Sequence, residues 1–138
     1  YSLCTPCPSF NVSKAEASFV KYAINSFLAT KVTFFNQLYD ACNAHGNVNF
    51  NKVIKAVGAD DRVSISHTKV PGFDGKQGYG GACFPKDTLA FSKFSDKLTL
   101  LAKAIEINNG YRSQYERDER EKEQNISFNH VQSSETVI

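Results

Sequence analysis

A helical pattern of apolar residues near the start of the chain sets the scale of the fold. It begins after Ser13, which is followed three residues later by Glu16, the spacing of a capping box at a helix N-terminus. It ends before Gly46, a residue type suited to the left-handed position after a helix. The apolar members are Val20, Ile24, Phe27, Leu28, Phe35, Leu38, Tyr39 and Cys42. A helix of about 30 residues would be roughly 45 Å long. One small domain cannot bury all of it, so we expect part of it to contact another subunit or domain.

Shorter helices are expected further along the chain. Phe50–Val57 carries apolar residues at helical spacing, and Asn49 can cap it. A third helix is expected to begin near Pro85, and a fourth is expected to be capped by Ser95. The charged stretch YERDEREKEQ, with almost no apolar residue, is interpreted as a solvated extension of the fourth helix.

A glycine-rich loop between Ala59 and Ala82 separates the second and third helices. Loops of this length in compact domains are usually functional or disordered. No internal repeat and no strand pattern is present, so the sequence predicts an all-α fold with one long N-terminal helix. Residues 13–124 form the expected helical domain, residues 1–12 a connector, and residues 125–138 a frayed tail.

Composition excludes several classes of protein. The 138 residues are 22% charged with a net charge of +2, and no basic stripe is interleaved with aromatic residues, so a nucleic-acid partner is not expected. No apolar run approaches the roughly 20 residues of a membrane span. No secretory signal is present, which favours reduced thiols and a cytoplasmic location. Because the chain has no methionine, Tyr1 is expected to begin a fragment or a processed piece.

The sequence GYGGACFPKD, from Gly78 to Asp87, holds the strongest candidate for chemistry. Proline is favoured in the first turn of a helix, so Pro85 makes Cys83 the expected last loop residue before that helix. Unpaired helix N–H groups and Lys86 would stabilise a thiolate there, whereas the negative charge of Asp87 would oppose it. The alternative is a buried, inert cysteine.

Other polar residues are weaker candidates. Lys21 and Asn25 are four residues apart and share a helix face, where they could bind an oxyanion or sugar hydroxyls, or form a solvated strip. Arg62 could pair with a phosphate or be a surface charge. The loop glycines could let backbone amides reach a phosphate or a sugar; they are Gly72, Gly75, Gly78, Gly80 and Gly81.

The pair Cys4 and Cys7 forms a C-x-x-C sequence, which suggests redox chemistry or half of a zinc site. No second pair is present, and the histidines at 45, 67 and 130 lack ligand spacing. We therefore expect no metal site.

The motif GYGGACFPKD resembles the UDP-glucose/GDP-mannose dehydrogenase family. The stretch AEASFVKYAINSFLATKVTFFNQL resembles the long helix of that family's central domain, and GADDRV resembles the loop that follows. The resemblance covers Ala15 to Gly110. It implies an enzyme that oxidises the 6-hydroxymethyl group of a nucleotide sugar, most often UDP-glucose, to a carboxylate with two NAD molecules. It also implies a helical domain that lies between two dinucleotide-binding-like domains and forms a homodimer through its long helix.

The resemblance also implies roles for individual residues. Cys83 resembles the nucleophile that forms a thiohemiacetal and then a thioester. Lys21 resembles the cation that stabilises the oxyanion, with Asn25 beside it, and Asp87 resembles the carboxylate that assists water.

The same resemblance implies ligand contacts for four further residues. Arg62 resembles an arginine that reaches substrate in the partner subunit. Tyr79 and Gly80 resemble the strip that packs near the sugar. Lys86 resembles a residue near NAD, which would be bound mainly by a domain absent from this chain.

Two alternatives stay open at this point. The chain alone could act only as a dimerisation or linker module without activity. A thiol-redox module built on Cys4 and Cys7 would instead form a reversible disulfide.

Overall fold

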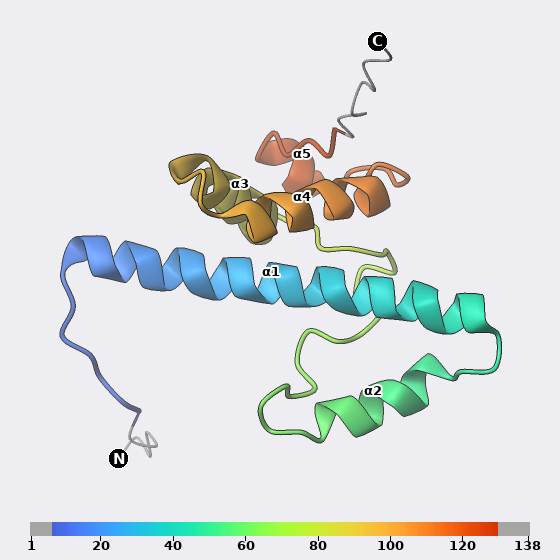
Figure 1. Cartoon of the computed structure of the whole chain (residues 1–138). Helices are drawn as coiled ribbons and strands as arrows, with labels where there is room; N and C mark the ends of the chain where they lie inside the picture. The colour runs from blue at the N-terminus through green and yellow to red at the C-terminus, as the bar shows by residue number, and fades with distance from the viewer. Residues whose placement is uncertain (1–6, 130–138) are drawn as a thin grey trace, which may run out of the picture.

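The computed structural model describes residues 7–129, which form five α-helices and no β-strand. The predicted all-α class is therefore confirmed. Helix α1 (Lys14–His45) runs the length of the molecule and is the element against which α2, α3 and α4 pack (Figure 1). Helices α3 (Cys83–Phe94), α4 (Thr99–Arg112) and α5 (Glu119–Glu123) lie on one side of α1, and α2 (Phe50–Gly58) lies on the other.

The predicted ends of α1 are confirmed by their cap contacts. Ser13 Oγ accepts a hydrogen bond from Glu16 N at 3.2 Å, and Glu16 Oε2 accepts one from Ser13 N at 2.7 Å. At the other end Gly46 has φ of 84° and donates its N–H to Cys42 O. Asn49 likewise caps α2, because its Oδ1 accepts from Lys52 N at 3.0 Å. Each of these signals acts over a few residues, so the local sequence was sufficient to predict it.

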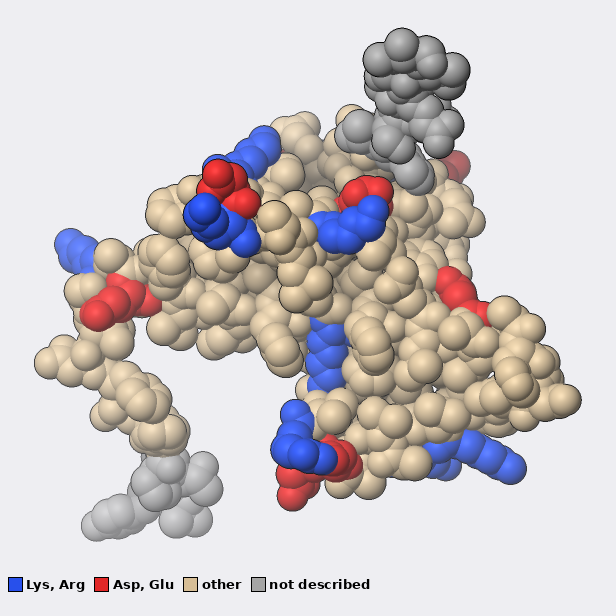
Figure 2. All heavy atoms as spheres, viewed as in Figure 1, with Lys and Arg blue, Asp and Glu red and all other residues tan. Residues whose placement is uncertain are grey.

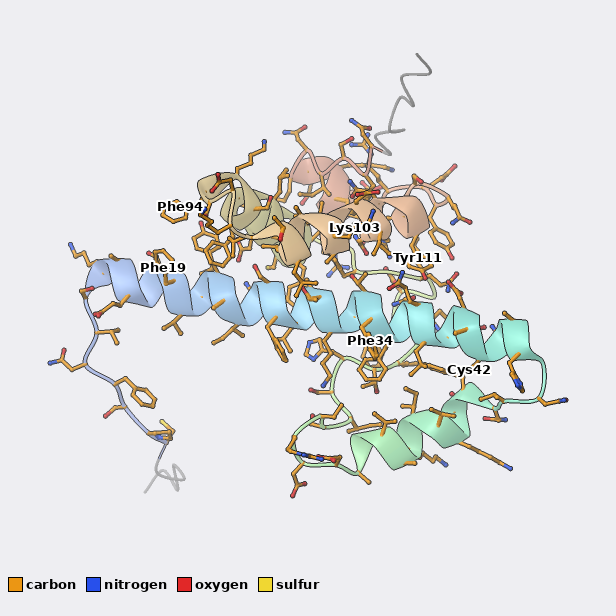
Figure 3. All side chains as sticks on the ribbon, viewed as in Figure 1. Phe19, Phe34, Cys42, Phe94, Lys103 and Tyr111 are labelled. Carbon is orange, nitrogen blue, oxygen red and sulfur yellow. The ribbon has the colours of Figure 1, made fainter. Side chains whose placement is uncertain are left out.

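Two packing regions hold the helices to α1. The side facing α2 contains the buried cluster, whose members are Phe35, Cys42, Phe50, Ile54 and Val70. Near the start of α1, aromatic rings join α1 to α3, and Figure 3 shows Phe19 and Phe94 approaching each other, with ring centroids 5.5 Å apart. These contacts fix α3, and therefore its first turn, against α1.

The predicted boundaries of the fourth helix are wrong. Ser95 ends α3, and α4 begins at Thr99 after Leu98, which makes no side-chain cap. The helix then ends at Arg112 and does not continue through the charged stretch.

Helix α5 is a separate element with a capping box of its own. Asp118 Oδ1 accepts from Glu121 N at 2.9 Å, and Glu121 Oε2 accepts from Asp118 N at 2.9 Å. Glu121 is buried, so the expectation of a fully solvated stretch is also wrong.

The ends of the described chain differ from each other. Residues 7–13 are exposed and have no regular structure, as expected for a connector. Ile126 is buried and donates its N–H to Glu121 O at 2.8 Å, so the expected frayed tail is wrong for this residue. Residues 1–6 and 130–138 of the expected connector and tail lie outside the described residues.

The surface of α1 retains large apolar side chains. Phe19, Val20, Ile24, Phe27 and Phe34 are all exposed. On the face shown in Figure 2, Lys and Arg side chains alternate with Asp and Glu, and no extended patch of one sign is visible. None of the helices within residues 7–129 combines the length and hydropathy of a membrane span.

Candidate functional site

A polar cluster joins α1 to α3. Asn25 Nδ2 donates a hydrogen bond to Asp87 Oδ2 at 2.7 Å, and Lys21 Nζ lies 3.7 Å from the same oxygen. The Asp87 side chain is 5% exposed, whereas that of Lys21 is 65% exposed. The structure therefore brings together three of the predicted site residues, with the carboxylate at the base and the ammonium group at the solvent edge.

Cys83 lies on the same helix as Asp87, one turn towards its start. It is the first residue of α3, not the last loop residue before it, and it is exposed. Residues four apart on a helix have side chains about 5–6 Å apart at Cβ. The thiol is thus one turn from the Lys21–Asn25–Asp87 cluster, and the alternative of a buried structural cysteine is wrong.

A pocket of about 680 Å³ adjoins Cys83. The glycine-rich loop contributes most of its wall, including Tyr79 and Gly80, and Lys69 and Arg120 are its cationic lining residues. Lys21, Asn25 and Asp87 do not line it. Cys83 therefore lies between two features. One is the pocket that the loop bounds, and the other is the polar cluster that joins α1 to α3.

Three backbone amides of the loop donate to side chains of the protein itself. Gly78 N donates to Asn36 Oδ1 at 3.0 Å, Tyr79 N to Asn108 Oδ1 at 2.7 Å, and Gly81 N to Glu121 Oε1 at 3.0 Å. These acceptors come from α1, α4 and α5. The three amides are used to fix the loop, so they are not available to a phosphate.

A buried ion pair lies beneath the loop. Arg112 Nη2 donates to Glu121 Oε1 at 2.7 Å, and both side chains are 1% exposed. Arg112 Nη1 also donates to Asp74 Oδ2 at 2.8 Å. Burial raises the pKa of Asp74, but the hydrogen bonds from Arg112 and from Lys76 N outweigh it, and the net shift is downward. Sequence reasoning missed this group because it interpreted the charged stretch as solvated.

Tyr79 is held inside the loop. Its side chain is buried, its hydroxyl lies 3.4 Å from Thr88 Oγ1, and burial raises the pKa of the phenol to about 12. The Asn108 side-chain amide donates to Tyr79 O at 3.0 Å, in addition to accepting from Tyr79 N. Tyr79 therefore supports the pocket wall chiefly through its backbone.

Arg62 and Lys86 are not brought to the pocket beside Cys83. The Arg62 guanidinium pairs with Asp60 Oδ2 at 2.7 Å, and this hydrogen bonding raises the pKa of Arg62. Its side chain is 89% exposed. Lys86 is exposed in the first turn of α3 and lines a second pocket of about 470 Å³, on the side of α4 and residues 124–128.

Comparison with known proteins identifies the family. Residues 15–110 match the model of the UDP-glucose/GDP-mannose dehydrogenase family, central domain. The chain belongs to this family.

Curated relatives agree with the family assignment. The chain is 38% identical over 86 residues to UDP-glucose 6-dehydrogenase of Rhizobium meliloti (strain 1021), a match that covers 62% of this chain and 18% of that protein. It is 34% identical over 106 residues to UDP-glucose 6-dehydrogenase YwqF of Bacillus subtilis (strain 168), covering 74% of this chain and 23% of that protein. It is 36% identical over 101 residues to UDP-glucose 6-dehydrogenase of Pseudomonas aeruginosa, covering 71% and 21%. The chain therefore spans about a fifth of the length of these relatives.

Some residues of the site and its support fall inside the region matched to the family, and others fall outside it. Cys83, Asp87, Lys21 and Asn25 all fall inside residues 15–110. Arg112 and the Glu121 segment fall outside it. Part of the support beneath the loop, the Arg112–Glu121 pair, is thus supplied by residues that follow the region matched to the central domain.

No described group of His, Cys, Asp and Glu side chains within residues 7–129 is arranged to bind a metal ion. Cys7 is an exposed free thiol, Cys42 is a buried free thiol, and Cys4 lies outside the described residues. Cys42 is one of the apolar members of the helical pattern expected after Ser13, and its burial fits that position.

Cys83 is expected to react with iodoacetamide faster than the other cysteines. Its thiol is exposed at the start of a helix and lines a pocket, whereas Cys42 is buried, so we expect its rate to exceed that of Cys42 more than about tenfold. The measurement is labelling at several pH values followed by peptide mapping, and exposed Cys7 is the internal control. Labelling of Cys83 last, or only after unfolding, would contradict the expectation.

Proposed function

We propose that this chain is the central domain of an NAD-dependent nucleotide-sugar 6-dehydrogenase that converts UDP-glucose to UDP-glucuronate. The observation that supports this most directly is the Lys21–Asn25–Asp87 cluster one helical turn from an exposed Cys83. The UDP-glucose 6-dehydrogenase relatives support the choice of reaction.

Cys83 is the proposed nucleophile. Its thiolate would add to the carbonyl carbon of an aldehyde at C6 of the sugar, forming a C–S bond while the carbonyl oxygen takes the negative charge and then a proton. Oxidation of this thiohemiacetal would leave a thioester, which water cleaves to the carboxylate and the free thiol. A thiolate suits both steps because it is a good nucleophile and a tolerable leaving group.

The cluster on α1 and α3 would stabilise the charge that develops on oxygen. The Lys21 ammonium is exposed and close to Asp87, so it can turn to an oxyanion beside Cys83, and the Asn25 amide is placed to assist. Asp87 is oriented by Asn25 and would hold the water that attacks the thioester. Each of these groups acts on a tetrahedral intermediate rather than on the bound substrate.

Ligand contacts are proposed for three further residues. Tyr79 and Gly80 line the pocket beside Cys83 and would pack near the sugar. Arg62 is exposed and away from that pocket, which suits an arginine that reaches substrate bound in a partner subunit.

The residues that the structure describes do not form an NAD site. Residues 7–129 contain no β-strand, so they lack the strand–loop–helix that cradles a dinucleotide pyrophosphate. Exposed Lys86 is the proposed contact with NAD from this chain. NAD, as acceptor of both hydrides, would be bound mainly by a different domain.

Calorimetry tests the assignment of NAD. We expect no micromolar binding of NAD to this chain and no NADH production from UDP-glucose, because Lys86 alone cannot replace a phosphate-binding loop. A longer protein that joins this domain to a dinucleotide-binding domain is the control and should produce NADH. NAD binding or turnover by this chain alone would contradict the proposal that NAD is bound mainly by a different domain.

A module that only dimerises or links domains is the second candidate, and it is favoured because residues 7–129 hold no strand–loop–helix for a dinucleotide. It differs from the first in predicting that Cys83→Ser leaves NADH production by the longer protein unchanged.

A homodimer through α1 is also proposed. The exposed apolar side chains of α1 form a surface of the kind that marks an interface. We further propose a cytoplasmic location, since the cysteines at 7, 42 and 83 are free thiols.

Light scattering at micromolar concentration should give a mass near twice the 15.3 kDa of one chain. Phe27→Asp, on the exposed face of α1, is expected to weaken the dimer more than about tenfold, because hot-spot aromatic residues dominate interfaces. Leu100→Asp, at an exposed position of α4, is the matched control and should leave the mass unchanged. A monomeric mass for the unmodified chain would contradict the proposed dimer.

A further inference from the structure

We propose that Glu121 and Arg112 are positioning residues for Cys83, which they hold in place through the glycine-rich loop. The proposal rests on the function proposed above only in taking Cys83 as the reactive group. Both residues follow the region matched to the family's central domain, which ends at residue 110.

The two side chains contact the loop directly before Cys83. Glu121 Oε1 accepts the N–H of Gly81 at 3.0 Å, and Gly81 has φ of 79°, a conformation that other residue types rarely adopt. The Arg112 guanidinium packs against the Cα of Gly80, where a Cβ would collide with it. Gly80 is therefore required by this contact, whether or not it also contacts a sugar.

The ion pair is itself held from several sides. Arg112 also donates to Asp74, and its guanidinium lies 5.6 Å from the centre of the Phe128 ring. The second oxygen of Glu121 accepts from Asp118 N at 2.9 Å. A buried polar network whose groups all have partners is rigid, because moving any one group leaves another unpaired in a medium of low dielectric.

The first residue of α3 is held less directly than the residues after it, because Pro85 and Asp87 are buried whereas Cys83 is exposed. The N-cap of the helix is Ala82, which makes no side-chain cap. The next residue back is Gly81, whose amide Glu121 holds. Because no side-chain cap precedes Cys83 and its own side chain is exposed, the backbone at Gly81 and Ala82 contributes to where the thiol lies.

The test compares variants of this chain by two measurements. Glu121→Ala removes the acceptor for Gly81, Glu121→Gln keeps an oxygen that can accept the same N–H, and Glu119→Ala changes an exposed residue of the same short helix. Amide hydrogen exchange by NMR reports Gly81. Iodoacetamide labelling with peptide mapping reports Cys83, and circular dichroism confirms that each variant folds.

We expect Glu121→Ala to speed exchange at Gly81 about tenfold, as for the loss of a buried hydrogen bond. It should also slow labelling of Cys83 about threefold, because the backbone before Cys83 is then no longer held and the thiol is less often presented to solvent at the start of α3. Glu121→Gln should retain most of the exchange protection at Gly81 and most of the labelling rate of Cys83. Glu119→Ala should change neither.

A folded Glu121→Ala variant with an unchanged or faster Cys83 rate would overturn the proposal. If Glu121→Ala does not fold, the double variant Arg112→Met with Glu121→Leu decides, since apolar replacement of a buried pair is often tolerated. The double variant should slow the labelling of Cys83 in the same way, and an unchanged labelling rate would overturn the proposal. The outcome is distinct from failure of the proposed function, which would appear as slow labelling of Cys83 in the unmodified chain.

Discussion

Replacement of Arg112 by alanine is expected to lower the free energy of unfolding by about 3–5 kcal/mol, the usual loss when one partner of a buried ion pair is removed. The Glu121 carboxylate would be left 1% exposed without its cation, and Asp74 would lose a hydrogen bond of 2.8 Å. Urea unfolding followed by circular dichroism measures the change.

Two other variants separate the ion pair from a general effect of lost charge. Arg120→Ala removes a cation whose side chain is 68% exposed, so its effect should stay within about 0.5 kcal/mol. Arg112→Met combined with Glu121→Leu should recover most of the loss, because no charge is then left buried. Equal losses for Arg112→Ala and Arg120→Ala would contradict the role assigned to the pair.

The parts of the fold that could be predicted depend on contacts between near neighbours in sequence. Ser13 and Glu16 cap α1 across three residues, and Asn49 caps α2 across three. Such signals are complete within a short stretch of sequence. The left-handed turn at Gly46 is of the same kind, because it requires only that residue and the last turn of the helix.

The end of α4 and the burial of Glu121 in α5 could not be predicted by the same reasoning. The pattern Asp118-x-x-Glu121 has the capping-box spacing already used at Ser13, and it was a signal that could have identified α5. It lies within a charged stretch, where charge indicates a solvated helix. Glu121 is buried only because Arg112 folds back over it, and such a pairing between separate helices is not visible in local spacing.

In the candidate site, too, local spacing predicted some features, whereas contacts between distant residues could not be predicted. Spacing alone predicted that Lys21 and Asn25 share a helix face. The hydrogen bond from Asn25 to Asp87 spans 62 residues, and only the family resemblance placed these residues in one site. The direction of the loop amides could not be predicted because their acceptors, Asn36 and Asn108 among them, come from other helices. Glycine supplies the freedom to turn an amide either way, and the surrounding side chains decide which way it points.

Lys21→Ala is expected to lower kcat about 100-fold in a longer protein that joins this domain to a dinucleotide-binding domain, the usual effect of removing one group that stabilises an oxyanion. The loss should appear equally in kcat and kcat/KM, because the ammonium group would act on charge that exists only in the transition state and the intermediates. Steady-state kinetics with UDP-glucose and NAD measure both. Lys14→Ala, at an exposed position in the first turn of the same helix, is the control and should leave both constants unchanged.

The geometry around Lys21 explains why we expect loss of turnover without loss of the fold. Its Nζ lies 3.7 Å from Asp87 Oδ2, beyond the range of a good hydrogen bond, and its side chain is 65% exposed, so the pair adds at most about 1 kcal/mol to stability. Asn25, at 2.7 Å, is the group that orients Asp87. The ammonium group is therefore free to turn to an oxyanion, and Lys21→Arg, which keeps the charge, should recover part of the lost rate. A change in KM alone would mean that Lys21 only binds substrate, and an unfolded Lys21→Ala variant would mean that its contact with Asp87 is structural.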